Sequence, residues 1–454
     1  MKDDWQASLS SGEVIELSRA HTLFSWSAQS KLDPIPMARG EGVYFWDMDG
    51  KRYLDFSSLV ICVNIGHGHP RVVQAIQDQA ARLTYAAPSM ASAPRARLGQ
   101  LLSEVTPGDL QVFFFTLGGA DANENALKIA RAYTGRSKIL ARYRSYHGAT
   151  HGALSLTGDP RRWAGEPGLP GVIHFLDPYR YRSVFHRGRA DLSEEEFSRD
   201  YLDHLEEVIQ FEGPESIAAV LIETVTGTNG LIIPPVGYLQ GVRDICTRHG
   251  ILLVCDEVMT GFGRTGKWFA VDHWGVVPDL MTMAKGLTSS YAPLGAVAMR
   301  SEIAQAFDDR AFQSGLTFNS HPLSLAAAIA NIEVIQEEKL VERSAQMGSL
   351  LSRRLAEMKD RHPTVGEVRS IGLFGVVELV RDRRSREPLA PFNATSAEMQ
   401  LLSAYFRERG LYTFFHWNNF FVAPPLVITE GQLDEGFEIV DEGLTRVDQA
   451  VRTS

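Results

Sequence analysis

Cysteine is scarce in this chain, with three residues among 454. Cys62, Cys246 and Cys255 stand in apolar stretches, and so small and odd a number does not make a disulfide framework. The N-terminal residues are acidic and polar, without the apolar core that a secretory signal peptide needs. We therefore expect a cytoplasmic protein in a reducing compartment.

Long hydrophobic runs and an excess of basic residues are also missing. No apolar run approaches the ~20 residues that a membrane-spanning helix requires, so no membrane contact is expected. Lysine and arginine number 45 against 55 acidic residues, and the formal net charge of -10 does not favour binding to nucleic acid. Small molecules are the expected partners.

The stretch from Val254 to Lys285 contains the strongest candidates for a functional site. An apolar run at 251–255 is typical of a strand buried on both faces, and it ends at Asp256. A second apolar run, at 280–284, leads into Lys285. Because ligands of open α/β sheets bind outside the carboxyl ends of strands, we expect Asp256 and Lys285 in one crevice. A structural ion pair would explain these two residues equally well.

A strand, a glycine turn and a helix are predicted at 112–116, 117–120 and 121–133. Glycines let the backbone approach an anion, and the N–H groups at a helix start bind phosphate. The spacing matches neither G-x-G-x-x-G nor the P-loop signature, so a plain turn is the alternative. Tyr146, near a second glycine, suits stacking on a planar ring, although a tyrosine in the core is the more common case.

Histidine pairs do not indicate a metal site. His67 and His69 lack further ligands at suitable spacing. His147 and His151 are four residues apart, but the glutamate of the H-E-x-x-H motif is absent. We expect no bound metal.

The order of the predicted elements indicates an α/β fold. Strands alternate with helices over residues 100–335, which implies a mostly parallel sheet covered by helices. After Glu337, charged helices flank short strands at 372–379 and 420–423. This last part is predicted to form a separate α+β unit.

Several motifs together resemble those of the class III pyridoxal-phosphate-dependent aminotransferases, often called omega-aminotransferases. The most specific are Asp256-Glu257-Val258, the glycine-rich loop at 261–266 and the run at 279–286, in that order and spacing. The run at 118–124 is similar to the family's Ser-Gly-Ser-Glu-Ala phosphate turn. The resemblance covers most of the chain, and a weaker one points to taurine–pyruvate-type members.

The resemblance implies the fold type I of pyridoxal-phosphate-dependent transferases. This fold has a large α/β domain with a mostly parallel central sheet, and a smaller α+β domain built from the N- and C-terminal segments. The expected division is an N-terminal segment at 1–60, a large cofactor-binding domain at 61–336 and a C-terminal small domain at 337–454.

The implied activity is transfer of an amino group from a primary amine or omega-amino acid to an oxo acid such as pyruvate. Pyridoxal 5'-phosphate is the implied cofactor, and the mechanism is ping-pong. A homodimer with a shared active site is implied, with a tetramer left open. The same lysine and acid would also serve a decarboxylase or an aminomutase, and a non-catalytic protein that binds the cofactor is a further alternative.

The resemblance also assigns roles to individual residues. Lys285 would bond covalently to the cofactor and then move the proton, which requires a partly desolvated and neutral amine. Asp256 would keep the pyridine nitrogen protonated, so that the ring withdraws electrons. Thr317 would reach the cofactor from a neighbouring subunit. The other implied cofactor contacts are Gly119, Ala120, Tyr146, His147, Glu223, Val258 and Phe318.

The sequence departs from the family pattern at three places, and the third bears on substrate specificity. Ala120 replaces the serine of the phosphate turn, and Thr224 stands where a proline usually follows the acid. Many relatives carry a carboxylate-binding arginine before Pro424-Pro425-Leu426, but residues 413–419 contain none. The oxo acid must therefore be held by another group, or the pocket prefers an apolar substrate. The expected aromatic substrate pocket consists of Phe24, Trp26, Leu59, Ile61, Phe414 and Trp417.

Overall fold

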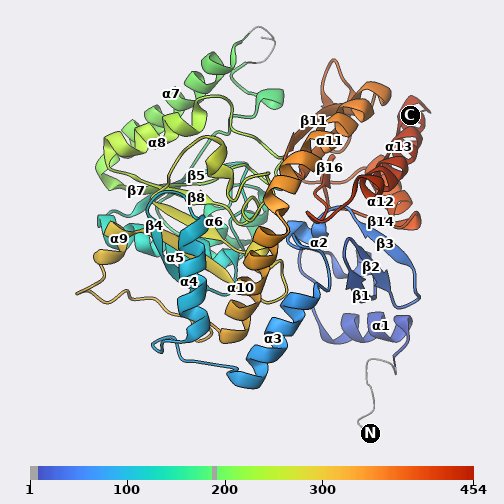
Figure 1. Ribbon diagram of the computed structural model, residues 1–454. Coiled ribbons are helices and arrows are strands. Elements are labelled where there is room, and N and C mark those ends of the chain that lie inside the picture. The colour runs from blue at the N-terminus through green and yellow to red at the C-terminus, as the bar shows by residue number, and fades with distance from the viewer. Residues whose placement is uncertain (1–8, 187–191, 454) are drawn as a thin grey trace.

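The computed structural model describes residues 9–186 and 192–453 (Figure 1). A seven-stranded sheet occupies the middle of the chain, in the order β4-β10-β9-β8-β7-β5-β6. β10 is antiparallel to both of its neighbours, and the other neighbouring strands are parallel. The predicted mostly parallel sheet is confirmed. Its strands are β4 (Leu110–Thr116), β5 (Lys138–Arg142), β6 (Val172–Phe175), β7 (Ile217–Glu223), β8 (Leu252–Asp256), β9 (Leu280–Met283) and β10 (Gly295–Arg300).

The two faces of this sheet pack against different helices. Leu253 and Cys255 of β8 belong to the apolar cluster that includes α7 and α8, whereas Val254 packs in the cluster of α5. Side chains alternate between faces along a strand, so Asp256 lies on the same face as Val254. The helices of this part are α3 (Pro70–Arg82), α4 (Ala93–Val105), α5 (Gly119–Thr134), α6 (His151–Leu156), α7 (Glu194–Glu212), α8 (Tyr238–His249), α9 (Ser301–Gln305) and α10 (Pro322–Glu337).

A four-stranded sheet joins the two ends of the chain. It includes a β-hairpin formed by β2 (Tyr44–Asp47) and β3 (Arg52–Asp55), with Gly50 at a φ of 84° in its turn, where glycine avoids the strain of a left-handed backbone. β14 (Leu411–Tyr412) pairs in parallel with β3, so the N-terminal segment lies beside the C-terminal part. The other elements of this segment are α1 (Ser11–His21), β1 (Met37–Glu41) and α2 (Ser58–Ile61).

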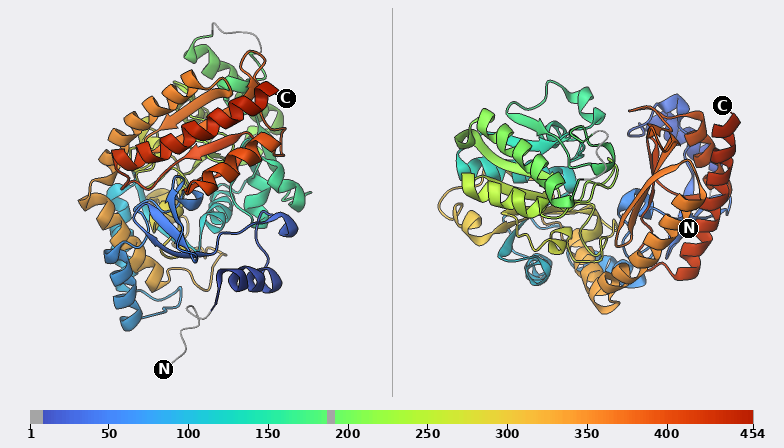
Figure 2. Two further views of the ribbon diagram at one scale, coloured as in Figure 1. Left: turned by 90° about the vertical axis from the view of Figure 1, so that its right-hand side faces the viewer. Right: turned by 90° about the horizontal axis from the view of Figure 1, so that it is seen from above.

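The C-terminal part forms an α+β unit, as predicted. Its sheet has the order β11-β12-β16-β15, with β13 paired to β12, and the long helices α11 and α13 lie across it (Figure 2). β11 was not expected from the sequence. The elements are α11 (Leu340–Arg361), β11 (Val365–Ile371), β12 (Phe374–Asp382), β13 (Glu387–Pro388), α12 (Ala397–Glu408), β15 (Phe415–His416), β16 (Asn419–Val422) and α13 (Glu430–Thr453).

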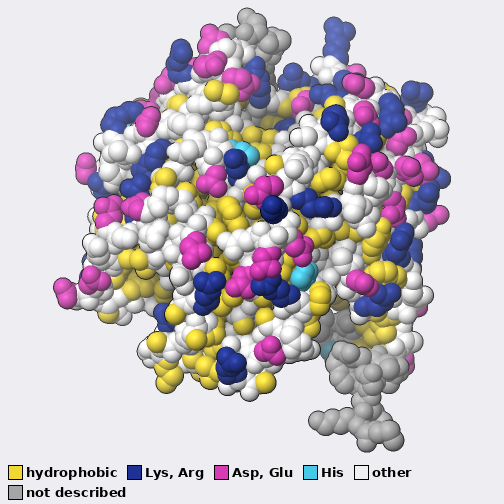
Figure 3. All heavy atoms as spheres, in the orientation of Figure 1, with side chains coloured by type: hydrophobic (Ala, Val, Ile, Leu, Met, Phe, Trp, Pro, Cys, Tyr) yellow, Lys and Arg dark blue, Asp and Glu magenta, His cyan; other side chains and the backbone are white. Residues whose placement is uncertain are grey.

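The predicted boundaries near residues 60 and 336 fall inside α2 and near the end of α10, and the division into domains stays a prediction. No helix in the described ranges combines the length and the apolar composition that crossing a membrane would need. On the face shown in Figure 3, acidic and basic side chains are interspersed.

Candidate active site

Three strands deliver polar side chains to one edge of the large sheet. Glu223 ends β7 and is paired with Asp256 at the end of β8, and Asp256 is paired with Thr282 of β9. Lys285 follows three residues after Thr282, at a φ of 44°. The parallel register thus brings Glu223, Asp256 and Lys285 to the carboxyl edge of the sheet, where α/β proteins bind ligands.

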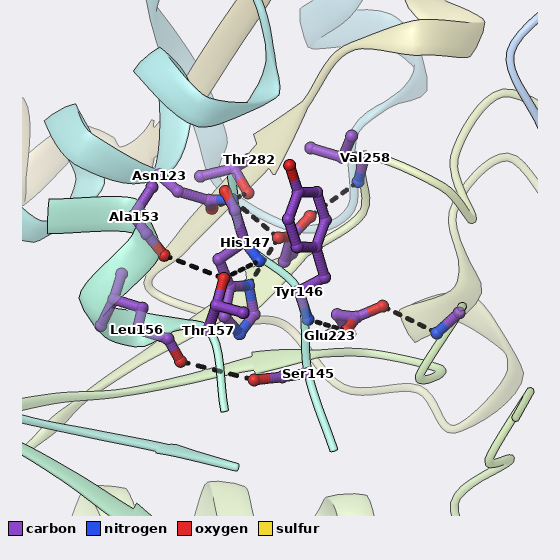
Figure 4. Close-up of polar contacts among 12 residues, drawn as sticks. Asn123, Ser145, Tyr146, His147, Ala153, Leu156, Thr157, Glu223, Val258 and Thr282 are labelled. Atoms are coloured by element: carbon purple, nitrogen blue, oxygen red, sulfur yellow. Dashed lines mark hydrogen bonds and ion pairs between the residues drawn. The ribbon is translucent and has the colours of Figure 1, made fainter. Parts of the chain in front are cut away.

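The carboxylate of Asp256 is held by three donors in a nearly solvent-free position. Oδ1 accepts the N–H of Val258 at 3.0 Å. Oδ2 accepts a hydrogen bond from Asn123 Nδ2 at 2.8 Å and lies 2.8 Å from His147 Nδ1 (Figure 4). These contacts fix the orientation of a buried acid that is 4% exposed.

The Lys285 amine has no partner. No hydrogen bond or ion pair reaches it from residues 9–186 or 192–453, so Asp256 and Lys285 do not form a structural ion pair. Burial lowers the pKa of Lys285, and the nearby Cys62, Asp256 and Glu223 only partly offset this effect. A lysine in this environment has an increased neutral fraction and is a better nucleophile.

The start of α5 offers unpaired backbone donors. The helix begins at Gly119, and no side chain caps it at Gly118. A Cβ atom at Gly119 would lie 2.9 Å from Val258 Cγ1, so glycine is required for this close approach. Free N–H groups at the positive end of a helix of this length suit a phosphate.

Tyr146 is held at this edge of the sheet by Glu223. Its N–H donates to Glu223 Oε1 at 2.9 Å, and Glu223 Oε2 accepts the Gly227 N–H at 2.7 Å. Burial raises the pKa of Glu223, against the effect of the nearby His147. The Tyr146 ring is contacted edge-on by Trp26, with centroids 6.1 Å apart.

Arg161 is a member of the site that the sequence did not reveal. Its guanidinium carbon lies 3.7 Å from the centroid of the Tyr146 ring. Nε donates to Asp159 at 3.0 Å and Nη2 to Thr228 at 2.9 Å, while Nη1 has no partner in the described part of the chain. Arg161 also contributes to lowering the pKa of Lys285, which places its charge near the amine.

Asn123 and Thr282 were missed as well. Thr282 Oγ1 donates to Asn123 Oδ1 at 2.8 Å, behind the Asp256 carboxylate. The sequence did contain a usable signal for Thr282, because this residue lies on the predicted strand before Lys285 and is paired with Asp256. Arg161 offered no such signal, because it lies in a short 3-10 helix at Pro160–Gly165 that no sequence pattern indicated.

The predicted cofactor contacts Thr317 and Phe318 lie apart from this cluster. Both are exposed on the connection between α9 and α10. The Thr317 carbonyl accepts the Tyr85 hydroxyl at 2.9 Å, and Phe318 packs edge-on against Tyr85. Within the described residues, no contact joins them to Asp256 or Lys285 of the same chain.

The six residues predicted for the substrate pocket are only partly brought together. Trp26 contacts Tyr146, and Ile61 and Phe414 share one apolar cluster. Leu59 lines a separate cavity of about 360 Å³ between the N-terminal segment and the C-terminal unit. Two more residues have other neighbours: Phe24 bonds through its backbone to Gln29, and Trp417 stacks on His416.

Comparison with known proteins identifies the family. The model of the aminotransferase class-III family matches residues 26–444. The chain belongs to the class-III aminotransferases. It is therefore an aminotransferase that depends on pyridoxal 5'-phosphate, and the predicted fold type I is confirmed.

Relatives of this aminotransferase match it over nearly their whole length. The putrescine–pyruvate aminotransferase of Pseudomonas aeruginosa is 34% identical over 99% of this chain and 97% of its own. The taurine–pyruvate aminotransferase of Bilophila wadsworthia is 35% identical over 96% and 98%. The solved taurine:2-oxoglutarate aminotransferase from Bifidobacterium kashiwanohense, in complex with PLP and glutamate, has 42% identity and a TM-score of 0.93 over 97% of this chain and 99% of that chain.

The residues at the sheet edge fit this cofactor. The unpaired Lys285 amine matches its aldehyde, the fixed Asp256 carboxylate matches its ring nitrogen, and the uncapped start of α5 matches its phosphate. No serine is present in the turn, so backbone N–H groups are the donors that this chain offers at Ala120.

Proposed function

We propose that this aminotransferase moves an amino group from a primary amine or omega-amino acid to a small oxo acid such as pyruvate. The observation that carries the proposal is the unpaired Lys285 amine beside the fixed Asp256 carboxylate, at the sheet edge where α5 begins. The pyruvate-dependent relatives support the choice of acceptor.

The cofactor-binding roles implied by the family resemblance are supported by contacts within the chain. The N–H groups of Gly119 and Ala120 bind the phosphate at the N-terminus of α5. Asp256 would bind the ring nitrogen, and Tyr146 and Val258 would cover the two faces of the ring. Glu223 holds the backbone of Tyr146 and thereby the position of that ring, and His147 holds Asp256. The bound cofactor supplies an electron-withdrawing ring that weakens the C–H bond next to the substrate nitrogen.

Lys285 is proposed to carry the proton. With the cofactor bound, Nζ of Lys285 would remove the proton from the substrate carbon next to the nitrogen, hold it and later return it. Burial favours this role, because it lowers the pKa of Lys285 and so increases the fraction of the amine that is neutral and able to act as a base.

Arg161 is proposed to replace the missing C-terminal arginine. Its free Nη1 faces no carboxylate of the described chain, and its position over Tyr146 would put the charge beside a substrate bound next to that ring. A carboxylate or sulfonate end of the substrate would form a charge-assisted hydrogen bond there. Trp26, edge-on to Tyr146, would limit the size of the substrate chain.

A homodimer in the cytoplasm completes the proposal. Thr317 and Phe318 are exposed and held by Tyr85, as expected if they reach the cofactor of a second copy. Phe318 exposes 54% of its surface and packs against the exposed Tyr85, and a second copy would cover this pair of rings.

A spectroscopic half-reaction tests the activity. The visible absorbance of the bound cofactor should fade when an amine donor is added and return when pyruvate follows, with alanine formed in equal amount. Release of carbon dioxide would show that the enzyme is a decarboxylase and not a transaminase. An isomerised product formed without any oxo acid would show that it catalyses an amino shift. An absorbance that does not respond to any amine would contradict catalysis altogether.

A further inference from the structure

A buried amide, Asn123, lies behind the Asp256 carboxylate and is fully hydrogen-bonded. Asn123 is 1% exposed and Thr282 is not exposed at all. Asn123 Nδ2 donates to Asp256 Oδ2 and to the carbonyl of His147, both at 2.8 Å, and Thr282 Oγ1 donates to Asn123 Oδ1 at 2.8 Å (Figure 4).

The chemistry of these contacts allows only one orientation of the amide. The carboxylate and the carbonyl accept hydrogen bonds, so both require the nitrogen of Asn123. The oxygen then faces the Thr282 hydroxyl, which acts as the donor. A flipped amide would place oxygen against oxygen at two contacts in a region closed to water, at a high cost.

The hydrogen bonds of Asn123 connect four segments that the proposed function places around the cofactor. Asn123 lies in the first turns of α5, which begins at the phosphate-binding turn. Its partners are the end of β8, the strand β9 three residues before Lys285, and the loop that carries Tyr146. One side chain thus fixes the position of the ring acid relative to the phosphate turn, the lysine strand and the stacking residue.

We propose that Asn123 is a positioning residue for the bound cofactor, and that Thr282 orients it. Without Asn123, Oδ2 of Asp256 would keep only the His147 ring as a partner, and Oδ1 only the Val258 N–H. The carboxylate would then be held by two contacts in place of three, and its orientation toward the ring nitrogen would be less firmly fixed. The inference rests on the proposed role of Asp256 and extends it to residues that do not touch the substrate.

Thr282 gives the sharpest test, because matched substitutions separate its hydroxyl from its shape. Thr282→Val keeps the volume and removes the donor, whereas Thr282→Ser keeps the donor. Thr106→Val is the control, since Thr106 also buries a bonded hydroxyl but lies in the turn after α4.

The readouts are the dissociation constant of pyridoxal phosphate from the holoenzyme and the pH titration of its visible absorbance. Thr282→Val should weaken cofactor binding about tenfold and shift the absorbance titration, because a buried acceptor loses its donor. kcat should fall by about tenfold or more, with the KM of the amine donor changed less than about twofold, since the group positions the cofactor and not the substrate. Thr282→Ser and Thr106→Val should bind the cofactor as the unchanged enzyme does.

Asp256→Asn separates a failure of the proposed positioning role of Asn123 and Thr282 from a failure of the proposed function. If Asp256→Asn changes cofactor binding and absorbance while Thr282→Val and Asn123→Leu do not, the positioning role is wrong. If Asp256→Asn also leaves both readouts unchanged, the role of Asp256 itself is wrong. An equal loss of cofactor affinity in Thr282→Val and Thr282→Ser would show that packing, and not the hydroxyl, causes the effect, and this would overturn the proposal.

Discussion

At the scale of single residues, the proposed substrate preference depends on the unpaired Nη1 of Arg161. Two sides of the guanidinium are used by Asp159 and Thr228, which hold it over Tyr146, and Nη1 is left for an anion. The charge is therefore positioned by the protein before the substrate arrives, which lowers the cost of binding.

Arg161→Met should raise the KM for pyruvate or for an acidic amine donor by about tenfold or more, because a charge-assisted hydrogen bond is lost. The KM for an uncharged alkylamine should change by less than about threefold, because hydrophobic contacts remain. Steady-state kinetics with both donor types measure the difference. Arg162→Met is the matched control, since Arg162 pairs with Glu166. Equal effects on charged and uncharged donors would exclude Arg161 as the anion-binding group.

At the scale of elements, the start of α5 depends on two glycines with different surroundings. A Cβ at Gly119 would meet Val258 Cγ1 at 2.9 Å, whereas a Cβ at Gly118 would meet no atom within 4 Å. Both glycines belong to the turn, but only Gly119 is packed against a side chain that is assigned to the cofactor ring.

Gly119→Ala should weaken pyridoxal phosphate binding by about tenfold, because overpacking displaces Val258 or the turn. Gly118→Ala should bind the cofactor nearly as the unchanged enzyme does, since its backbone is extended at a φ of 179°. Equilibrium dialysis of both variants gives the two dissociation constants. Similar losses in both would mean that the turn, and not the contact with Val258, is the sensitive feature.

The connection between α11 and β11 is tied to α13 by a histidine. His362 Nδ1 lies 2.8 Å from Asp448 and Nε2 lies 2.9 Å from Asp441. Burial opposes protonation of His362, but the two carboxylates outweigh it and raise the pKa. The folded state therefore binds a proton more tightly than the unfolded chain.

This linkage predicts the sign of a pH effect on stability. The contribution of His362 is fully present below its ordinary pKa of about 6.5 and is lost as the pH rises through the raised value in the folded state. Denaturant unfolding of His362→Gln should show the largest loss in the free energy of unfolding near pH 6 and a smaller loss at pH 9. A loss that is constant over this range would show that His362 is not charged in the folded protein.

For the whole molecule, sharing of the active site between subunits can be tested by complementation. Lys285→Ala should be inactive, and Thr317→Glu should repel the cofactor phosphate. If each site takes Lys285 from one chain and Thr317 from the other, a mixed dimer contains one intact site, and a random mixture recovers about a quarter of the sites. Activity after refolding the two variants together measures this recovery. No recovery would place Thr317 outside the partner's site.

The sequence was sufficient to predict the parts of the fold and of the site that depend on local patterns. Buried strands that end at Asp256 and before Lys285 are visible as apolar runs, and the glycine turn marks the start of α5, so the sheet edge was predictable. Asn123 and Arg161 were not, because their roles arise from contacts between segments far apart in the chain. Thr317 and Phe318 were assigned by resemblance alone, and one chain does not bring them to the site.

Covalent mapping of the cofactor tests the central claim most directly. Borohydride reduction of the holoenzyme converts the bond between the cofactor and its lysine into a stable amine, and peptide mass spectrometry then locates the label. We predict that the label lies on Lys285, and that Lys285→Ala takes up none. Label on another lysine, or none on the unchanged protein, would contradict the account.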